Sequence, residues 1–197
     1  MAIARAKKRA PLNERELFDY AVGVLARRMR TVRDLKRLMR MRVAEGEAGE
    51  RAMDGVCARL KELGYLSDKR FAADYTRLRK ENEKFGRRRV QQDLALKGVH
   101  RELIATTLAK AYDEVDEAAL AREYIARKRM KKPAGADAAA IQKETARVMG
   151  RLARAGFSPA AIFKVLREWE LPEDAMPVEG GADSDSYAER DEDLPEF

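Results

Sequence analysis

The chain has 197 residues, of which 45% are hydrophobic and 38% are charged, and its formal net charge is +7. This composition excludes one large apolar core and favours a series of small helical units. Residues 170–197 hold eleven acidic side chains and only one arginine, a net of −10, so residues 1–169 carry +17. A body this basic predicts a polyanion or an acidic protein surface as its partner.

The predicted elements, taken in chain order, are helices. Apolar residues recur at helical spacing from Leu17 to Leu25 and again in almost every later segment, and we find no strand-like alternation. Turn signals interrupt the pattern at Gly46 and Gly49, at 63–68, 85–86, Gly98, 132–135 and 156–159. The sequence therefore predicts an all-α protein of about nine helices.

An internal repeat organises these helices. A shift of 58 residues places 89–108 over 147–166, and the matched pairs are Arg89 with Arg147, Val90 with Val148, Leu94 with Leu152, Gly98 with Gly156, Ile104 with Ile162 and Leu108 with Leu166. A glycine that recurs beside core positions is typical of a left-handed residue ending a helix. Ser158 and Pro159 predict the cap and first residue of the helix that follows.

A weaker copy of the repeat lies in the first third of the chain, at Leu35, Met39, Val56 and Leu60. Together the copies predict an elongated array of three tandem three-helix units, at 12–66, 67–112 and 113–171. We expect a disordered basic segment at 1–11 and a disordered acidic tail at 172–197. Two roles stay open for the tail: keeping the protein soluble, or folding back on the basic body and tuning its affinity for DNA.

Residue types that perform catalysis are scarce. His100 is the only histidine and Cys57 the only cysteine, and we expect a surface or capping role for the first and a buried structural role for the second. The chain has no phosphate-binding glycine loop of a known type. We therefore predict no enzyme activity, no metal and no cofactor. The single cysteine excludes an intramolecular disulfide, and no signal segment or long apolar run occurs, so we expect a cytoplasmic protein without membrane contact. We also expect a monomer.

Dense clusters of basic side chains, and basic side chains near the ends of comparable helices, supply the candidate partner-binding residues. With one tyrosine, they are Arg27, Arg28, Arg33, Lys36, Arg37, Arg40, Tyr75, Arg79, Lys84, Arg87, Arg88, Arg89, Arg127, Lys128 and Arg129. Arginines can hold DNA phosphates beside tyrosines such as Tyr20, Tyr75 and Tyr124, or can pair with carboxylates of a protein partner. Solvated helix faces and packed tyrosines are the alternative. Arg87 and Arg88 do not recur in the third unit, which favours them as contacts of the middle one.

The middle of the chain carries a specific pattern, at Leu60, Leu63, Gly64, Tyr65, Leu66, Asp68, Phe71, Ala72 and Tyr75, then Gly86, Arg89, Val90, Leu94, Lys97, Gly98 and Val99. This pattern resembles the RecX family, regulators of the RecA recombinase. The resemblance extends over about 14–170, with departures after Val43 and in the connection at 132–140. The acidic tail lies outside the family pattern.

The resemblance implies a helical protein without catalytic residues that lies in the groove of the RecA filament on single-stranded DNA. There it would lower the ATPase, strand-exchange and coprotease activities of RecA, and so act in DNA repair, homologous recombination and the SOS response. Two other functions stay open. The chain could bind single- or double-stranded DNA directly as an architectural protein, or serve as a general helical scaffold.

Overall fold

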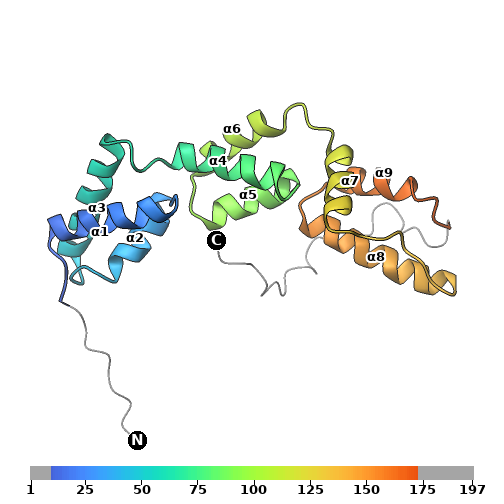
Figure 1. The fold of residues 1–197 in the computed structure, drawn as a ribbon, viewed down its shortest axis with the longest axis horizontal. Coiled ribbons are helices and arrows are strands. Elements are labelled where there is room, and N and C mark those ends of the chain that lie inside the picture. Colours follow the sequence, from blue (N-terminus) through green and yellow to red (C-terminus); the bar gives the residue numbers. More distant parts are fainter. Residues whose placement is uncertain (1–9, 173–197) are drawn as a thin grey trace, which may run out of the picture. The chain divides into compact units, whose positions relative to one another are not determined.

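The computed structural model describes residues 10–172, and within this range it contains nine α-helices and no strand (Figure 1). The helices are α1 (Glu14–Arg27), α2 (Val32–Arg40), α3 (Glu47–Glu62), α4 (Asp68–Glu81), α5 (Arg87–Leu96), α6 (Arg101–Tyr112), α7 (Glu117–Arg127), α8 (Ala138–Arg154) and α9 (Pro159–Arg167). The all-α prediction is confirmed. Nearly all of the predicted basic N-terminal segment and acidic tail lies outside the described residues.

The chain divides into two compact units. The first comprises the described residues up to Arg77 together with Gln91–Ala111, and the second comprises Leu78–Val90 together with the described residues from Tyr112 onward. Helices α4 and α5 each contribute residues to both units. The three units expected from the repeat have their boundaries between helices instead. These boundaries stay a prediction.

The core of the first unit forms where α1, α2 and α3 meet (Figure 1). Its buried residues are Leu17, Ala21, Leu35, Met39, Met53, Val56, Cys57, Leu60 and Leu66. They include the four positions of the weak first repeat and the lone cysteine, so the expectation of a buried structural thiol is confirmed. Asn13 caps α1 through a capping box, because its side chain accepts from the amide of Glu16 and the Glu16 carboxylate accepts from the amide of Asn13.

The core of the second unit joins α7, α8 and α9. Tyr124 packs edge-on against Phe157 with their ring centroids 5.7 Å apart, and Phe85 lies 6.2 Å from Tyr124. The remaining buried residues include Val148, Leu152, Ile162, Val165 and Leu166. The core positions predicted from the repeat are buried in both copies, since Val90, Leu94, Ile104 and Leu108 are buried as well.

The glycine turns are confirmed at both predicted positions. Gly98 and Gly156 have φ angles of +75° and +91°, and each ends its helix before a buried residue whose amide bonds back to a helical carbonyl. Ser158 caps α9 with Pro159 in its first turn. Gly49, which the sequence predicts as a turn, lies instead inside the first turn of α3, where a Cβ would meet the carbonyl oxygen of Ala44 at 2.0 Å. That prediction was wrong because glycine is needed there for close backbone approach and not for a turn.

Candidate partner-binding surfaces

The start of α5 is held by the end of α8. The amide of Gly86 donates to the carbonyl of Ala155 (2.8 Å), and the amide of Arg88 donates to the carbonyl of Gly156 (3.3 Å). Free amides at a helix start form the positive end of the helix dipole, and carbonyls at a helix end form the negative one. The contact therefore places the positive end of the α5 dipole against the negative end of the α8 dipole. This arrangement offsets the electrostatic cost of three arginines, with no acidic residue, in the first turn of α5.

The three arginines of α5 have different surroundings. Arg87 and Arg88 are exposed and form no ion pair with any described residue. Arg89 is half-buried, its guanidinium lies 5.7 Å from the ring centroid of Phe85, and its backbone amide lies so close to Gly156 that a Cβ on the glycine would approach it to 2.2 Å. Arg89 is therefore a packing residue, whereas Arg87 and Arg88 are presented to solvent.

The start of α2 makes the corresponding contact with the turn after α5. The buried hydroxyl of Thr31 donates to the carbonyl of Lys97 (2.7 Å), and its oxygen accepts from the amide of Asp34. The amide of Val32 donates to the carboxylate of Asp68 (2.9 Å). Arg33 lies over the turn, where a Cβ on Gly98 would meet its Nε at 2.4 Å.

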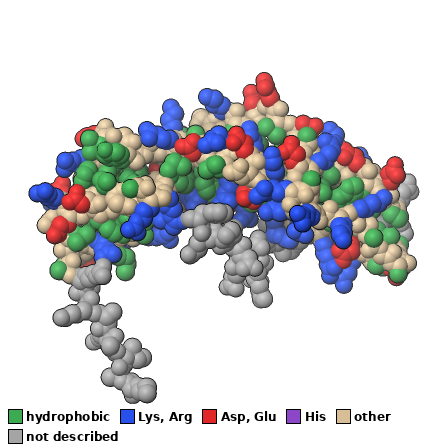
Figure 2. Space-filling view, in the orientation of Figure 1, with side chains coloured by type: hydrophobic (Ala, Val, Ile, Leu, Met, Phe, Trp, Pro, Cys, Tyr) green, Lys and Arg blue, Asp and Glu red, His purple; other side chains and the backbone are tan. Residues whose placement is uncertain are grey.

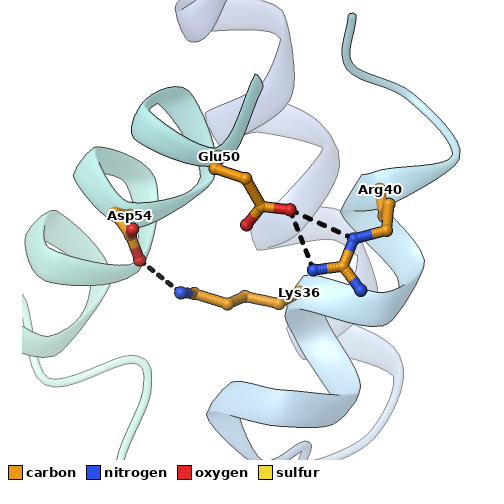
Figure 3. A network of polar contacts seen from close by, with 4 residues as sticks. All are labelled: Lys36, Arg40, Glu50 and Asp54. Atoms are coloured by element: carbon orange, nitrogen blue, oxygen red, sulfur yellow. Dashed lines mark hydrogen bonds and ion pairs between the residues drawn. The ribbon is translucent and has the colours of Figure 1, made fainter. Parts of the chain in front are cut away.

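The basic face of α2 is paired with α3. Figure 3 shows the Lys36 ammonium bonded to Asp54 and the Arg40 guanidinium bonded to Glu50 through Nε and one terminal nitrogen. The hydrogen bond that Lys36 donates to Asp54 raises the pKa of Lys36. Arg37 pairs with Asp34 on its own helix (3.6 Å). Exposed pairs of this kind contribute about 0–1 kcal/mol each, so carboxylates of a partner could replace those of α3 at little cost.

A second set of ion pairs links the segment after α4 to α7. Lys84 pairs with Glu123 (2.7 Å), and both Arg127 and Lys128 lie 3.4 Å from the carboxylate of Glu83. Arg129 follows with a φ of +50° and is exposed. Three of the four predicted cations in this cluster thus have partners within the fold.

Tyr75 and Arg79 also have intramolecular contacts. The hydroxyl of Tyr75 donates to Asp93 (3.0 Å) and its ring stacks on Phe71 at 5.6 Å, while the guanidinium of Arg79 lies 5.9 Å from the centroid of Phe85. Tyr124 is buried, and Tyr20 lies beneath Arg42. These contacts are typical of packing, which favours that alternative over base stacking for the tyrosines.

Six of the candidate cations are exposed and without an ion pair to any described residue. They are Arg27, Arg28, Arg33, Arg87, Arg88 and Arg129. Figure 2 shows basic side chains in blue on both units, interspersed with acidic and apolar ones. Arg30, which is close to Arg28 in the chain, is more buried than these cations. Burial is the main cause that lowers the pKa of Arg30, and the charge of Arg28 is the second.

One basic surface was missed by the sequence-based candidates. A groove of about 850 Å³ lies between the segment 130–134 and α8, and its cations are Lys131, Lys132, Lys143, Arg147, Arg151 and Arg154. Its single carboxylate, Glu144, is paired with Arg147. The recurrence of a cation every fourth residue at 143, 147 and 151 was the signal that could have revealed it, because such residues share one helix face.

Two negative findings concern residues 10–172. No group of three or more His, Cys, Asp or Glu side chains in this range is arranged to hold a metal ion. None of its helices is long and apolar enough to cross a membrane.

Comparison with known proteins identifies relatives over most of the length of the chain. Residues 67–108 match the family profile described as "RecX, second three-helix domain". A protein named regulatory protein RecX from Streptomyces coelicolor is 32% identical over 139 residues, covering 71% of this chain and 69% of the relative. One of the same name from Trichlorobacter lovleyi is 32% identical over 138 residues, covering 70% of this chain and 84% of the relative.

Solved structures share the fold. The crystal structure of RecX from Lactobacillus salivarius aligns with a TM-score of 0.58 and 18% identity, covering 81% of this chain and 97% of that one. A second crystal structure of a regulatory protein RecX aligns with a TM-score of 0.62 and 20% identity, covering 79% and 73%. At these identities the structures establish the similarity of the fold alone.

Proposed function

Because this chain belongs to the RecX family of regulatory proteins, we propose that it binds the RecA filament on single-stranded DNA and lowers the ATPase, strand-exchange and coprotease activities of RecA. It acts by binding and not by catalysis, as a monomer in the cytoplasm. The observation that carries the proposal is the rigid presentation of Arg87 and Arg88. Main-chain hydrogen bonds to Ala155 and Gly156 fix the start of α5, while the two side chains stay exposed.

Arginine suits either component of a nucleoprotein filament. Its planar guanidinium forms paired hydrogen bonds with the carboxylates of a protein and with the phosphates of DNA. The other exposed cations, at Arg27, Arg28, Arg33 and Arg129, lie near the starts or ends of helices in different parts of the chain. Several weak contacts on one chain raise the effective concentration of each for the next, so such a protein can engage successive subunits of a filament.

The test is the ATPase rate of RecA on single-stranded DNA, measured with and without micromolar amounts of the protein. We expect inhibition that rises with concentration and weakens as salt is added, because the contacts are ionic. Binding to the same DNA without RecA is measured in parallel. Tight DNA binding without any inhibition of RecA would contradict the proposal and support the direct DNA-binding alternative.

A further inference from the structure

The groove along α8 is lined by cations that lie outside the candidate residues above. Its six cations lie on one side of α8 and on the adjoining segment 130–134, against a single carboxylate that is already paired. Lys143, Arg151 and Arg154 are exposed and form no ion pair with any described residue. The groove therefore holds positive charge that the described fold does not neutralise.

The uncharged part of the groove lining offers no surface on which nucleic-acid bases could stack. The groove has no aromatic side chain, and its uncharged walls come from residues such as Met130, Pro133, Ala134 and Val148. Single-stranded nucleic acid is usually held by aromatic platforms as well as by charge. An extended chain of carboxylates needs no such platform, because cations and aliphatic walls are enough to hold it.

A segment rich in carboxylates follows soon after the groove residues in the sequence. Residues 173–197 hold ten acidic side chains and only Arg190, a net of −9. They follow α9, which packs on α8 in the core of the second unit. A stretch of 25 residues can extend over roughly 80 Å, so the distance to the groove does not limit its reach. Its attachment to the same chain also gives it a high effective concentration there.

We infer that the groove formed by 130–134 and α8 binds the acidic segment 173–197 of the same chain. The segment neutralises Lys143, Arg151 and Arg154, and it excludes other polyanions from the groove until they displace it. Because ionic contacts are screened over about 10 Å at 0.1 M salt, the occupancy of the groove falls as salt rises. The contact requires neither RecA nor DNA, so it can be tested separately from the proposed function.

The experiment uses the full-length chain with the ten acidic residues of 173–197 changed to Asn or Gln, which leaves the groove free. A fluorescein-labelled peptide with the natural sequence of 173–197 is titrated with this protein at low salt, and binding is followed by fluorescence anisotropy. The groove variant adds Lys143→Gln, Arg151→Gln and Arg154→Gln. The matched control adds Lys69→Gln, Arg70→Gln and Arg101→Gln, which remove the same charge from exposed helix starts elsewhere. Circular dichroism checks that all three proteins are folded.

We expect the groove variant to bind the peptide roughly tenfold more weakly than the parent, and the control to differ by less than about twofold. Equal weakening in both variants, or no binding of the peptide to the parent, would overturn the inference. A labelled oligothymidylate serves as a second probe. If the groove variant lost affinity for that probe alone and kept its affinity for the peptide, the groove would be a nucleic-acid site and the inference would be wrong.

Discussion

The amide of Gly86 and the carbonyl of Ala155 are joined by a hydrogen bond of 2.8 Å, which attaches the start of α5 to the turn after α8. Thr31 makes the equivalent contact with Lys97 at the start of α2. In both cases the accepting carbonyl belongs to the residue before a left-handed glycine, Gly156 or Gly98. The repeated glycine therefore marks a repeated contact, in which the start of one helix bonds to the carbonyl that precedes the glycine. We call this the docking contact.

The first prediction concerns the glycine in this contact. Gly156→Ala should lower the free energy of unfolding by about 2–5 kcal/mol, because a left-handed alanine costs about 1–2 kcal/mol and its Cβ would also collide with the backbone of Arg89. Gly64→Ala is the matched control, since Gly64 has φ +73° but open space around it, and it should cost only the left-handed term of about 1–2 kcal/mol. Urea unfolding measures both, and equal losses would contradict the docking contact.

The second prediction concerns the Thr31 hydroxyl. Thr31→Val keeps the shape of the side chain but leaves the carbonyl of Lys97 and the amide of Asp34 without this partner, so we expect a loss of about 1–3 kcal/mol. Thr31→Ser keeps the hydroxyl and should lose less than about 1 kcal/mol. Thermal unfolding compares the two variants. A serine variant as unstable as the valine variant would show that the methyl group matters more than the hydrogen bonds.

The third prediction separates binding from folding at α5. Arg87→Gln with Arg88→Gln should weaken the inhibition of RecA on the order of tenfold without changing the melting temperature, because both side chains are exposed. Arg89 is left in place, since its removal would disturb the packing on Phe85. The control, Lys69→Gln with Arg70→Gln, removes equal charge from the start of α4. Full inhibition by the Arg87 and Arg88 variant would refute their role.

The fourth prediction is a dependence of stability on acid. Hydrogen bonds from the amides of Ala119 and Ala118 hold the pKa of Asp116 below its ordinary value of 3.8, and the Arg122 guanidinium holds the pKa of Glu168 below 4.5. Between the folded and unfolded pKa values the unfolded chain binds more protons, so stability rises with pH there. The contribution is complete above the ordinary values and is lost as the pH falls through the lower, folded ones.

The double variant Asp116→Asn, Glu168→Gln should therefore lose less of its free energy of unfolding than the parent does as the pH falls from neutral to about 3. Asp113→Asn with Glu114→Gln is the control, because these exposed carboxylates accept no hydrogen bond from residues 10–172. Denaturant unfolding at each pH supplies the comparison. The explanation fails if the control variant flattens the pH dependence as much as the other pair does.

The fifth prediction uses Cys57 as a probe of the first unit. The thiol is 3% exposed, and burial raises its pKa, so it should react with a thiol reagent roughly a hundredfold more slowly than in the denatured chain. Because the chain has no other cysteine, the rate reports the opening of α1–α3 directly. Rapid labelling of the folded protein would contradict the packing described for this core.

The sequence was most informative where local rules decide the structure. Helical spacing identified the core positions of both repeat copies, and the recurrence of Gly98 and Gly156 predicted their left-handed turns, since both signals lie within a few residues. Contacts between helices were not predictable in this way. Lys36 and Asp54 are 18 residues apart, and only the packing of α2 on α3 makes them partners.

The same limit applies to the candidate site. Charge density alone could not separate Arg89, which packs, from Arg87 and Arg88, which do not, although the recurrence of Arg89 as Arg147 already indicated a structural role. The α8 groove was missed because part of its lining comes from segment 130–134, whose place beside α8 depends on the fold. Gly49 was misread because glycine serves close backbone approach as well as turns.

The docking contact also sets an order of events during synthesis. The hydroxyl of Thr31 can form its hydrogen bond only after Lys97, 66 residues further along the chain, has been made. The amide of Gly86 likewise needs a carbonyl from the turn after α8. Because the chain is synthesised from its N-terminus, the first three helices are translated before the residue that completes the start of α2. The starts of α2 and α5 are therefore each completed by residues that are made later.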